Sequence, residues 1–207
     1  KSISGKNILI AGSLPTQEIV YFSKRVTDDK EIFNGFSATA NILNPNVDLF
    51  YLDVLSSINE IKIACEAIKD LQKPILIGVH LNKKGFLPSG ETIEDLLPIS
   101  NDYNCCGIIT ACVSPEIVNL VMPKLINQNL PFGFKVNAFK NIPENKALDS
   151  DSYLNGYPTE RYGSRADEFT PDVFEKFVTS ASKQGASFLG GCCEIKPRHI
   201  SSLKNLF

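Results

Sequence analysis

Six short stretches of mostly apolar residues recur along the chain, and polar, charge-rich stretches separate them. Apolar runs of this length with few polar interruptions are typical of parallel β-strands that are covered on both faces. We therefore predict strands over residues 7–14, 47–55, 74–81, 105–113, 131–139 and 187–193.

Three of the intervening stretches carry apolar residues at helical spacing with charged residues on the opposite face. They cover residues 57–71, 115–128 and 170–184. The first has a serine N-cap at Ser56 or Ser57, and the third opens with Thr170 as a cap and proline at the first helical position. Strands that alternate with helices predict a parallel α/β fold.

The polar segment 140–168 lacks clear periodicity and follows the fifth predicted strand. Structureless segments of this length are uncommon and often functional, so we interpret it as a lid or an oligomer contact over the site. A surface loop without a role is the alternative.

Composition and charge narrow the classes of function. Hydrophobic residues make up 43% of the chain and charged residues 21%, with a net charge of −2. This balance gives no reason to expect nucleic acid or a membrane surface as a partner. No apolar run reaches the roughly 20 residues that span a bilayer, and no signal-peptide pattern is present. The six cysteines do not resemble a disulfide framework in a chain of this length, so we expect reduced thiols in a cytoplasmic protein.

Three cysteines fall at the ends of two predicted strands. The segment Gly190-Gly191-Cys192-Cys193 ends the sixth strand, and Cys112 ends the fourth, just before Ser114-Pro115. Adjacent cysteines in a strand point to opposite faces, but both thiols can converge on one ion if the strand ends there and the backbone turns. Cys112, Cys192 and Cys193 therefore predict a three-thiolate metal site with one open position.

The donor set indicates the chemistry of such a site. Zn²⁺ prefers four tetrahedral ligands, and three thiolates leave one position free while giving the unit a formal charge of −1. That unit is a poor activator of water, yet it still lowers the pKa of an incoming thiol, which is ordinarily about 8.5. The bound sulfur remains a nucleophile, so the site favours thiol alkylation over hydrolysis.

At these residues the chain resembles the zinc-dependent homocysteine S-methyltransferases, which include the betaine-, S-methylmethionine- and cobalamin-dependent enzymes. The late Gly-Gly-Cys-Cys segment is followed by Pro197, His199 and Ile200, and the earlier cysteine by Ser114 and Pro115. Weaker matches are Ala11-Gly12-Ser13, the turn Ser89-Gly90-Glu91 and Asn137 after a late strand. The resemblance spans nearly the whole chain. Glu194 departs from it, because the family usually has glycine directly after the doublet.

The resemblance implies a (β/α)8 TIM barrel formed by one domain, residues 1–207. Eight strands typically need about 250 residues, whereas six are countable here, the chain begins at Lys1 and the family's opening Asp-Gly-Ala-Met-Gly-like segment has no match. We therefore expect the first one or two β/α units to be absent from this chain. That opening segment helps hold the amino acid part of homocysteine in the family.

The resemblance further implies zinc-dependent transfer of a methyl group from a small donor to the thiol of homocysteine, giving methionine. Asp53 stands where the family has a glutamate that contacts the amino group of homocysteine, and Asn137 matches an asparagine that bonds substrate or a neighbouring loop. The alternatives are a solvated carboxylate and an Asx turn. S-methylmethionine, S-adenosylmethionine, a betaine and dimethylsulfonium compounds remain open as donors, and so does a homo-oligomer.

Two other classes of function stay open. One is a Schiff-base lyase that uses Lys135, a lysine within an apolar strand, as its nucleophile. The other is a non-catalytic relative that binds zinc or thiols. Cys65, Cys105 and Cys106 are assigned to core packing, which is also the alternative for the three cysteines of the site. We expect a structural role for His199. His80 falls at a strand end, where a structural role is expected and a place in the mouth of the site is the alternative.

Overall fold

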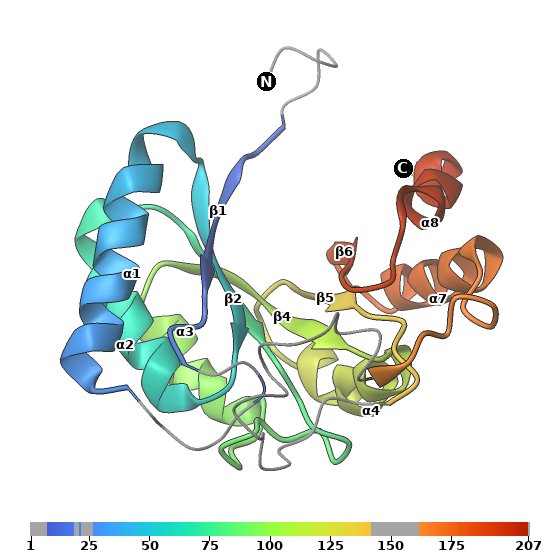
Figure 1. The fold of residues 1–207 in the computed structure, drawn as a ribbon, viewed down its shortest axis with the longest axis horizontal. Coiled ribbons are helices and arrows are strands. Elements are labelled where there is room, and N and C mark those ends of the chain that lie inside the picture. The colour runs from blue at the N-terminus through green and yellow to red at the C-terminus, as the bar shows by residue number, and fades with distance from the viewer. Residues whose placement is uncertain (1–7, 19–20, 22–26, 142–161, 207) are drawn as a thin grey trace.

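The computed structural model describes residues 8–18, 21, 27–141 and 162–206, and it is an α/β fold built on one parallel sheet. The strands lie side by side in the order in which they occur along the chain, so each connection moves the chain to the adjacent position. The sheet is curled (Figure 1). Its members are β1 (Ala11–Pro15), β2 (Leu49–Leu55), β3 (Ile75–Val79), β4 (Cys105–Val113), β5 (Phe132–Val136) and β6 (Phe188–Gly191).

Helices lie along the convex side of this sheet (Figure 1). The main apolar core fills the space between them and the strands, with fully buried residues such as Phe36, Phe50 and Phe174. A smaller cluster of Tyr51, Leu76 and Ile109 belongs to the other, concave side. The helices are α1 (Asp29–Leu43), α2 (Ile58–Ile68), α3 (Leu97–Asp102), α4 (Pro115–Ile126), α7 (Pro171–Lys183) and α8 (Pro197–Ser202).

Local sequence signals explain where the helices begin. Ser57 caps α2 by accepting a hydrogen bond from the Glu60 amide, as predicted, and proline occupies the first turn of α4 and of α7. Sequence analysis did not predict α1. Its Asp28 cap accepts hydrogen bonds from two backbone amides, while Ile32, Phe36 and Ala40 supply a narrow buried stripe at intervals of four residues.

The predicted parallel α/β fold is confirmed, and each predicted strand and helix is present within a few residues of its predicted bounds. The described residues form six parallel strands, which is consistent with part of a TIM-like barrel. The expected absence of one or two units is not tested by the structure. Of the predicted segment 140–168, residues 142–161 lie outside the described residues; after them, Ser164 forms an isolated bridge with Phe139.

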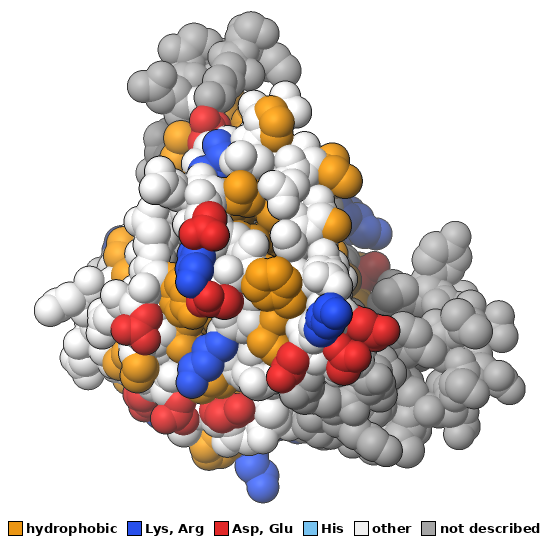
Figure 2. Space-filling view, turned by 90° about the vertical axis from the view of Figure 1, so that its left-hand side faces the viewer, with side chains coloured by type: hydrophobic (Ala, Val, Ile, Leu, Met, Phe, Trp, Pro, Cys, Tyr) orange, Lys and Arg blue, Asp and Glu red, His pale blue; other side chains and the backbone are white. Residues whose placement is uncertain are grey.

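The outer face formed by α1 and α2 mixes apolar and charged side chains (Figure 2). Two hollows on the described surface, of about 400 and 520 Å³, lie near α2, and no cysteine lines either of them. Among the described residues, no helix combines the length and the apolar character that crossing a bilayer requires.

Candidate metal centre

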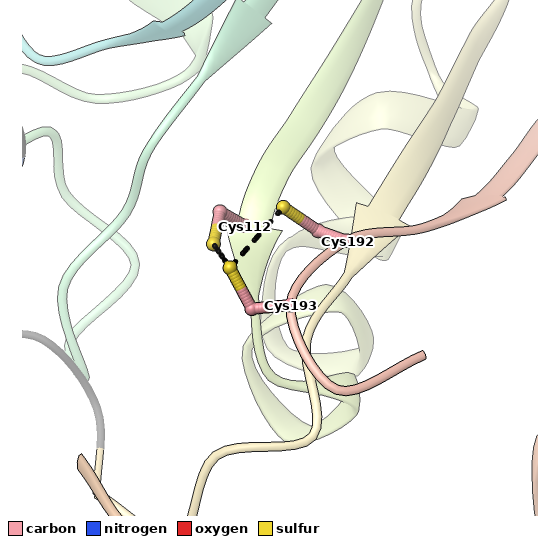
Figure 3. Close-up of side chains that lie close together, drawn as sticks. All are labelled: Cys112, Cys192 and Cys193. Carbon is pink, nitrogen blue, oxygen red and sulfur yellow. Dashed lines mark hydrogen bonds between the residues drawn. The ribbon is translucent and has the colours of Figure 1, made fainter. Parts of the chain in front are cut away.

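The three predicted cysteines meet at the carboxyl end of the sheet. Cys112 is near the end of β4, and Cys192 and Cys193 directly follow β6; their side chains point toward one another (Figure 3). The sulfur of Cys193 lies 3.8 Å from the sulfur of Cys112 and 3.8 Å from that of Cys192. All three sulfur atoms lie within 4.8 Å of one another. Their role as metal ligands stays a prediction.

An irregularity in β4 turns Cys112 toward this cluster. The pairing of β4 with β5 shifts register between Ala111 and Val113, and Cys112 itself has a φ of +55°, in the left-handed region that side chains other than glycine rarely adopt. The buried Asn137 holds this conformation, because its amide nitrogen donates to the carbonyl oxygen of Cys112 at 2.7 Å. The same nitrogen lies 3.7 Å from the Cys112 sulfur.

Asn137 therefore combines the two interpretations made from the sequence. Its side-chain oxygen accepts a hydrogen bond from the Phe139 amide at 3.3 Å, which is an Asx turn ending the strand. Its nitrogen bonds a neighbouring loop, here Cys112. A contact between Asn137 and substrate stays a prediction.

A tight turn brings the adjacent cysteines onto one side. β6 ends at Gly191, and the Cys192 amide donates to the Val136 carbonyl at 2.6 Å, which ties the segment to the end of β5. The chain then turns: Ile195 donates to the Cys192 carbonyl, and Glu194 has a φ of +65°. Glycine adopts such an angle without strain, so Glu194 carries a conformational cost that its hydrogen bond from Ser164, at 2.7 Å, helps to offset.

His199 has the structural role expected for it, because its hydrogen bonds hold the chain that follows the turn at Glu194. The side chain is fully buried, and its Nδ1 accepts a hydrogen bond from the Lys196 amide at 2.9 Å. Its Nε2 therefore carries the proton and donates to the Phe169 carbonyl at 3.0 Å. A neutral imidazole thus links the start of α8 to the chain just before α7.

Tyr21 reaches the cluster and was not predicted from the sequence. Its hydroxyl lies 3.1 Å from the Cys112 sulfur, and its ring packs on the buried His80 ring with centroids 4.4 Å apart. The one signal in the sequence is its place after the first predicted strand, because loops at the carboxyl ends of parallel strands gather around one site. An aromatic residue there has no spacing motif that would single it out.

The cluster stabilises one thiolate even without a metal. Hydrogen bonds from the thiols of Cys192 and Cys193, and further ones from Tyr21 and Asn137, lower the pKa of Cys112 well below the usual value for a thiol. The pKa values of Cys192 and Cys193 are raised, chiefly through the same hydrogen bonds, because a second negative charge would repel the first. Burial and the nearby charge of Cys112 raise the pKa of Tyr21.

The sulfur spacing can be compared with the geometry of a zinc site. Four tetrahedral sulfur ligands at a Zn–S distance of about 2.3 Å are separated from one another by about 3.8 Å. Two of the three sulfur–sulfur distances here have this value. The residues present therefore fit a tetrahedral Zn²⁺ ion, and three protein ligands leave the fourth position to another group.

Asp53 and Lys135 form an ion pair beside this cluster. The Lys135 ammonium donates to both carboxylate oxygens of Asp53, at 2.6 and 2.8 Å. Asp53 lies in a stretch of β2 whose register with β3 shifts between Leu52 and Leu55, where Val54 has a φ of +62°. The predicted contact between Asp53 and the homocysteine amino group stays a prediction.

The other three cysteines lie away from the cluster, as expected for packing residues. Cys65 is fully buried in α2, and burial raises the pKa of its thiol to about 12. Cys105 and Cys106 open β4, at the opposite end of the strand from Cys112. Burial raises the pKa of Cys105 to about 11 and also raises that of Cys106.

Comparison with known proteins identifies the family of the chain. The family described as homocysteine S-methyltransferase matches residues 1–207. The chain belongs to this family. The resemblance that the cysteine motifs indicated is thereby confirmed.

Two curated relatives are homocysteine S-methyltransferases 1 and 2 of Saccharomyces cerevisiae. The first is 24% identical over 167 residues, which cover 77% of this chain and 48% of the yeast protein. The second is 23% identical over 173 residues, covering 77% and 47%. The chain thus spans about half the length of the curated relatives it matches.

Solved structures of the homocysteine methyltransferase MmuM from Escherichia coli share the fold. The metallated form superposes with a TM-score of 0.71 at 17% identity, covering 97% of this chain and 62% of that one. The apo form gives a TM-score of 0.65 at 18% identity, with 96% and 63% covered.

Proposed function

We propose that this protein transfers a methyl group to the thiol sulfur of homocysteine, giving methionine, and that Cys112, Cys192 and Cys193 bind Zn²⁺ for this purpose. The observation that carries the proposal is the convergence of three thiols from two strand ends at the spacing of a tetrahedral zinc site. Membership of the homocysteine S-methyltransferase family agrees with it. One of the MmuM structures is a metallated form, and this supports the binding of a metal by the present chain.

The Zn²⁺ ion, when bound, holds a substrate thiol as its thiolate at neutral pH. The chain's own residues prepare that position. The three cysteines present their sulfur atoms from one side, and Asn137 keeps Cys112 in its left-handed conformation. Tyr21 lies against the Cys112 sulfur, where its hydroxyl proton is retained because burial raises its pKa.

The negative charge of three thiolates suits methyl transfer better than hydrolysis. It keeps electron density on the substrate sulfur, which attacks the methyl carbon while the bond from that carbon to the donor atom breaks. No proton needs to move during this step, because the sulfur enters it already deprotonated. The protein then has to hold sulfur and methyl donor in line, which is a matter of positioning.

The lyase alternative receives less support from the structure. A Schiff-base nucleophile needs a free amine, whereas the Lys135 nitrogen is bonded to both oxygens of Asp53. The alternative of a non-catalytic zinc- or thiol-binding relative predicts metal and thiol binding without turnover, so the assay below separates it from the proposal.

Methionine formation from L-homocysteine tests the proposal directly. The reduced, zinc-loaded protein is supplied in turn with S-methylmethionine, S-adenosylmethionine, glycine betaine and dimethylsulfoniopropionate, and methionine is measured by mass spectrometry. We expect turnover with at least one donor. We expect turnover to be abolished by a chelator and by Cys192→Ala, since each removes the proposed zinc site.

Cys105→Ala is the matched control, because it removes a half-buried thiol from the opposite end of the sheet. It should retain zinc and activity. Zinc and homocysteine binding without methionine from any donor would establish the non-catalytic alternative. Turnover that survives in Cys192→Ala would contradict the proposed role of this cluster.

A further inference from the structure

The Asp53–Lys135 ion pair spans the concave side of the sheet. Asp53 is on β2 and Lys135 is on β5, with β3 and β4 between them. In a flat sheet these strands would lie about 14 Å apart, from a spacing of about 4.8 Å per strand. Both side chains therefore extend from the inner wall of the curled sheet and meet across its hollow, at 2.6 Å.

This ion pair remains accessible. The Lys135 side chain is 23% exposed and that of Asp53 is 20% exposed, so both charged groups can be reached by a ligand. Among the described residues, the Ser13 hydroxyl donates to Asp53 at 3.5 Å, and the Tyr51 ring centroid lies 5.1 Å from the lysine nitrogen. The inner wall therefore offers a positive and a negative group side by side.

The ion pair also lies close to the thiols. In the sheet register Lys135 is opposite Ala111, the residue before Cys112, and opposite Gly190, two residues before Cys192. Two residues along a strand correspond to about 7 Å. Among the described residues, a Cβ added at Gly190 would have one neighbour within 4 Å, the Phe134 carbonyl oxygen at 3.6 Å, so the described part of this wall is open.

We propose that Lys135 binds the carboxylate of an amino-acid thiol at this place, beside the contact between Asp53 and the ammonium group that the family resemblance already implies, so that the ion pair holds the zwitterionic end of the ligand. The proposal rests on the function proposed above and names its specificity determinant, Lys135. In homocysteine, two methylene groups separate the sulfur from the carbon that carries both charges. A thiol held at the cysteine cluster thus places its charged end beside the ion pair.

Charge balance explains why both charges are required. A thiol with an ammonium group alone competes with Lys135 for Asp53 and leaves the lysine without a partner. A thiol with a carboxylate alone competes with Asp53 for Lys135 and leaves the aspartate without a partner. A zwitterion replaces one ion pair by two, so neither charge loses its partner.

Binding of four thiols to the zinc-loaded protein tests this. The ligands are L-homocysteine, 4-sulfanylbutanoate without the amine, 3-aminopropane-1-thiol without the carboxylate, and propane-1-thiol, each measured by titration calorimetry. Wild type should bind L-homocysteine at least about tenfold more tightly than any of the other three, which is a modest value for charge-assisted hydrogen bonds.

The Lys135→Met variant separates recognition from a structural role. It should weaken L-homocysteine and 4-sulfanylbutanoate about 10- to 100-fold, while 3-aminopropane-1-thiol binds as tightly as before or more tightly, because Asp53 is released. Lys135→Arg should restore part of the preference for the carboxylate. Lys124→Met is the matched control, since it removes a lysine from a surface ion pair with Glu94 and should change nothing.

Zinc content is measured for every variant, so that loss of the site is recognised. Equal weakening of all four thiols in Lys135→Met, or a wild type that binds them equally, would overturn this proposal and leave methyl transfer to thiols standing. If the zinc-loaded wild type binds no thiol at all, the proposed function fails, and the present inference fails with it.

Discussion

The chain contains the dipeptide Cys-Cys twice, and the two copies occupy different kinds of position in the sheet. Cys105 and Cys106 begin β4, where the Cys105 thiol donates to the Gly107 carbonyl at 3.3 Å. Cys192 and Cys193 follow the end of β6, and their sulfur atoms lie 3.8 Å apart. The dipeptide alone therefore predicts nothing, and its position relative to the end of a strand decides what it does.

The physical reason is the alternation of side chains along a strand. Within β4, consecutive side chains project from opposite faces of the sheet. The thiols of Cys105 and Cys106 therefore cannot bind one ion together. Beyond β6 the backbone turns at Glu194, and the constraint no longer applies. The carboxyl end of a parallel sheet also collects the loops that follow every strand, which is why Cys112 from β4 is available there.

Removing one cysteine from each pair has the largest expected effect. Cys193→Ala removes a proposed ligand and should lower zinc affinity by more than about 100-fold, beyond the loss typical of supporting residues. Cys106→Ala should retain one zinc per chain. Zinc content after dialysis, with circular dichroism as a check of folding, provides the measurement. Equal zinc contents in the two variants would refute the contrast drawn between the pairs.

The next largest expected effect is the pH dependence with which Cys105, in the first Cys-Cys pair, is alkylated. A pKa of about 11 for Cys105, against an ordinary 9.0, leaves about 100-fold less thiolate at pH 8, because a raised thiol pKa disfavours the reactive form. Its reaction with iodoacetamide in the folded, zinc-loaded protein should rise about tenfold per pH unit up to pH 10. The measurement is mass spectrometry of the Cys105 peptide.

The urea-unfolded protein serves as the reference for this experiment. There the rate for the same peptide should bend at the ordinary thiol pKa and level off by about pH 10, where an ordinary thiol is almost fully ionised. A rate that likewise levels off by about pH 10 in the folded protein would show that burial does not hold Cys105 in its thiol form.

The smallest effect concerns the residue that holds Cys112 in place. Asn137→Ala removes the hydrogen bond to the Cys112 carbonyl, and with it the support for a φ of +55°. Zinc affinity should fall roughly tenfold, at the lower end for a supporting residue. Asn127→Ala is the control, because that amide bonds the Pro123 carbonyl on the surface of α4. Competition with a chromogenic chelator reads out both variants, and unchanged affinity in Asn137→Ala would remove Asn137 from the proposed site.

Strand periodicity was sufficient to predict the architecture. Apolar runs such as 74–79, separated by segments whose apolar residues have helical spacing, fit few structures other than buried strands. The parallel order of the strands follows from the alternation of strands and helices. Helix α1 was missed because its buried stripe of Ile32, Phe36 and Ala40 is narrow and its flanks are polar. A pattern of this kind lies near the limit of what periodicity detects.

The sequence motifs were sufficient to predict that the three cysteines lie together. They did not predict which residues surround the cysteines. The bulges near Cys112 and Val54 depend on pairing with neighbouring strands, which no local pattern records. The same is true of Tyr21 against Cys112 and of Lys135 against Asp53, residues 91 and 82 positions apart. Contacts at such separations arise from the curvature of the sheet.

The separation of the cysteines has a consequence for folding. Cys112 and Cys193 are 81 residues apart, and the chain between them includes α4, β5, α7 and β6. An ion held by both would close this long loop and restrict the unfolded chain, much as a covalent crosslink does. Because a metal bound only by the native arrangement adds its binding free energy to folding, its release and the unravelling of the C-terminal half would be a single cooperative event.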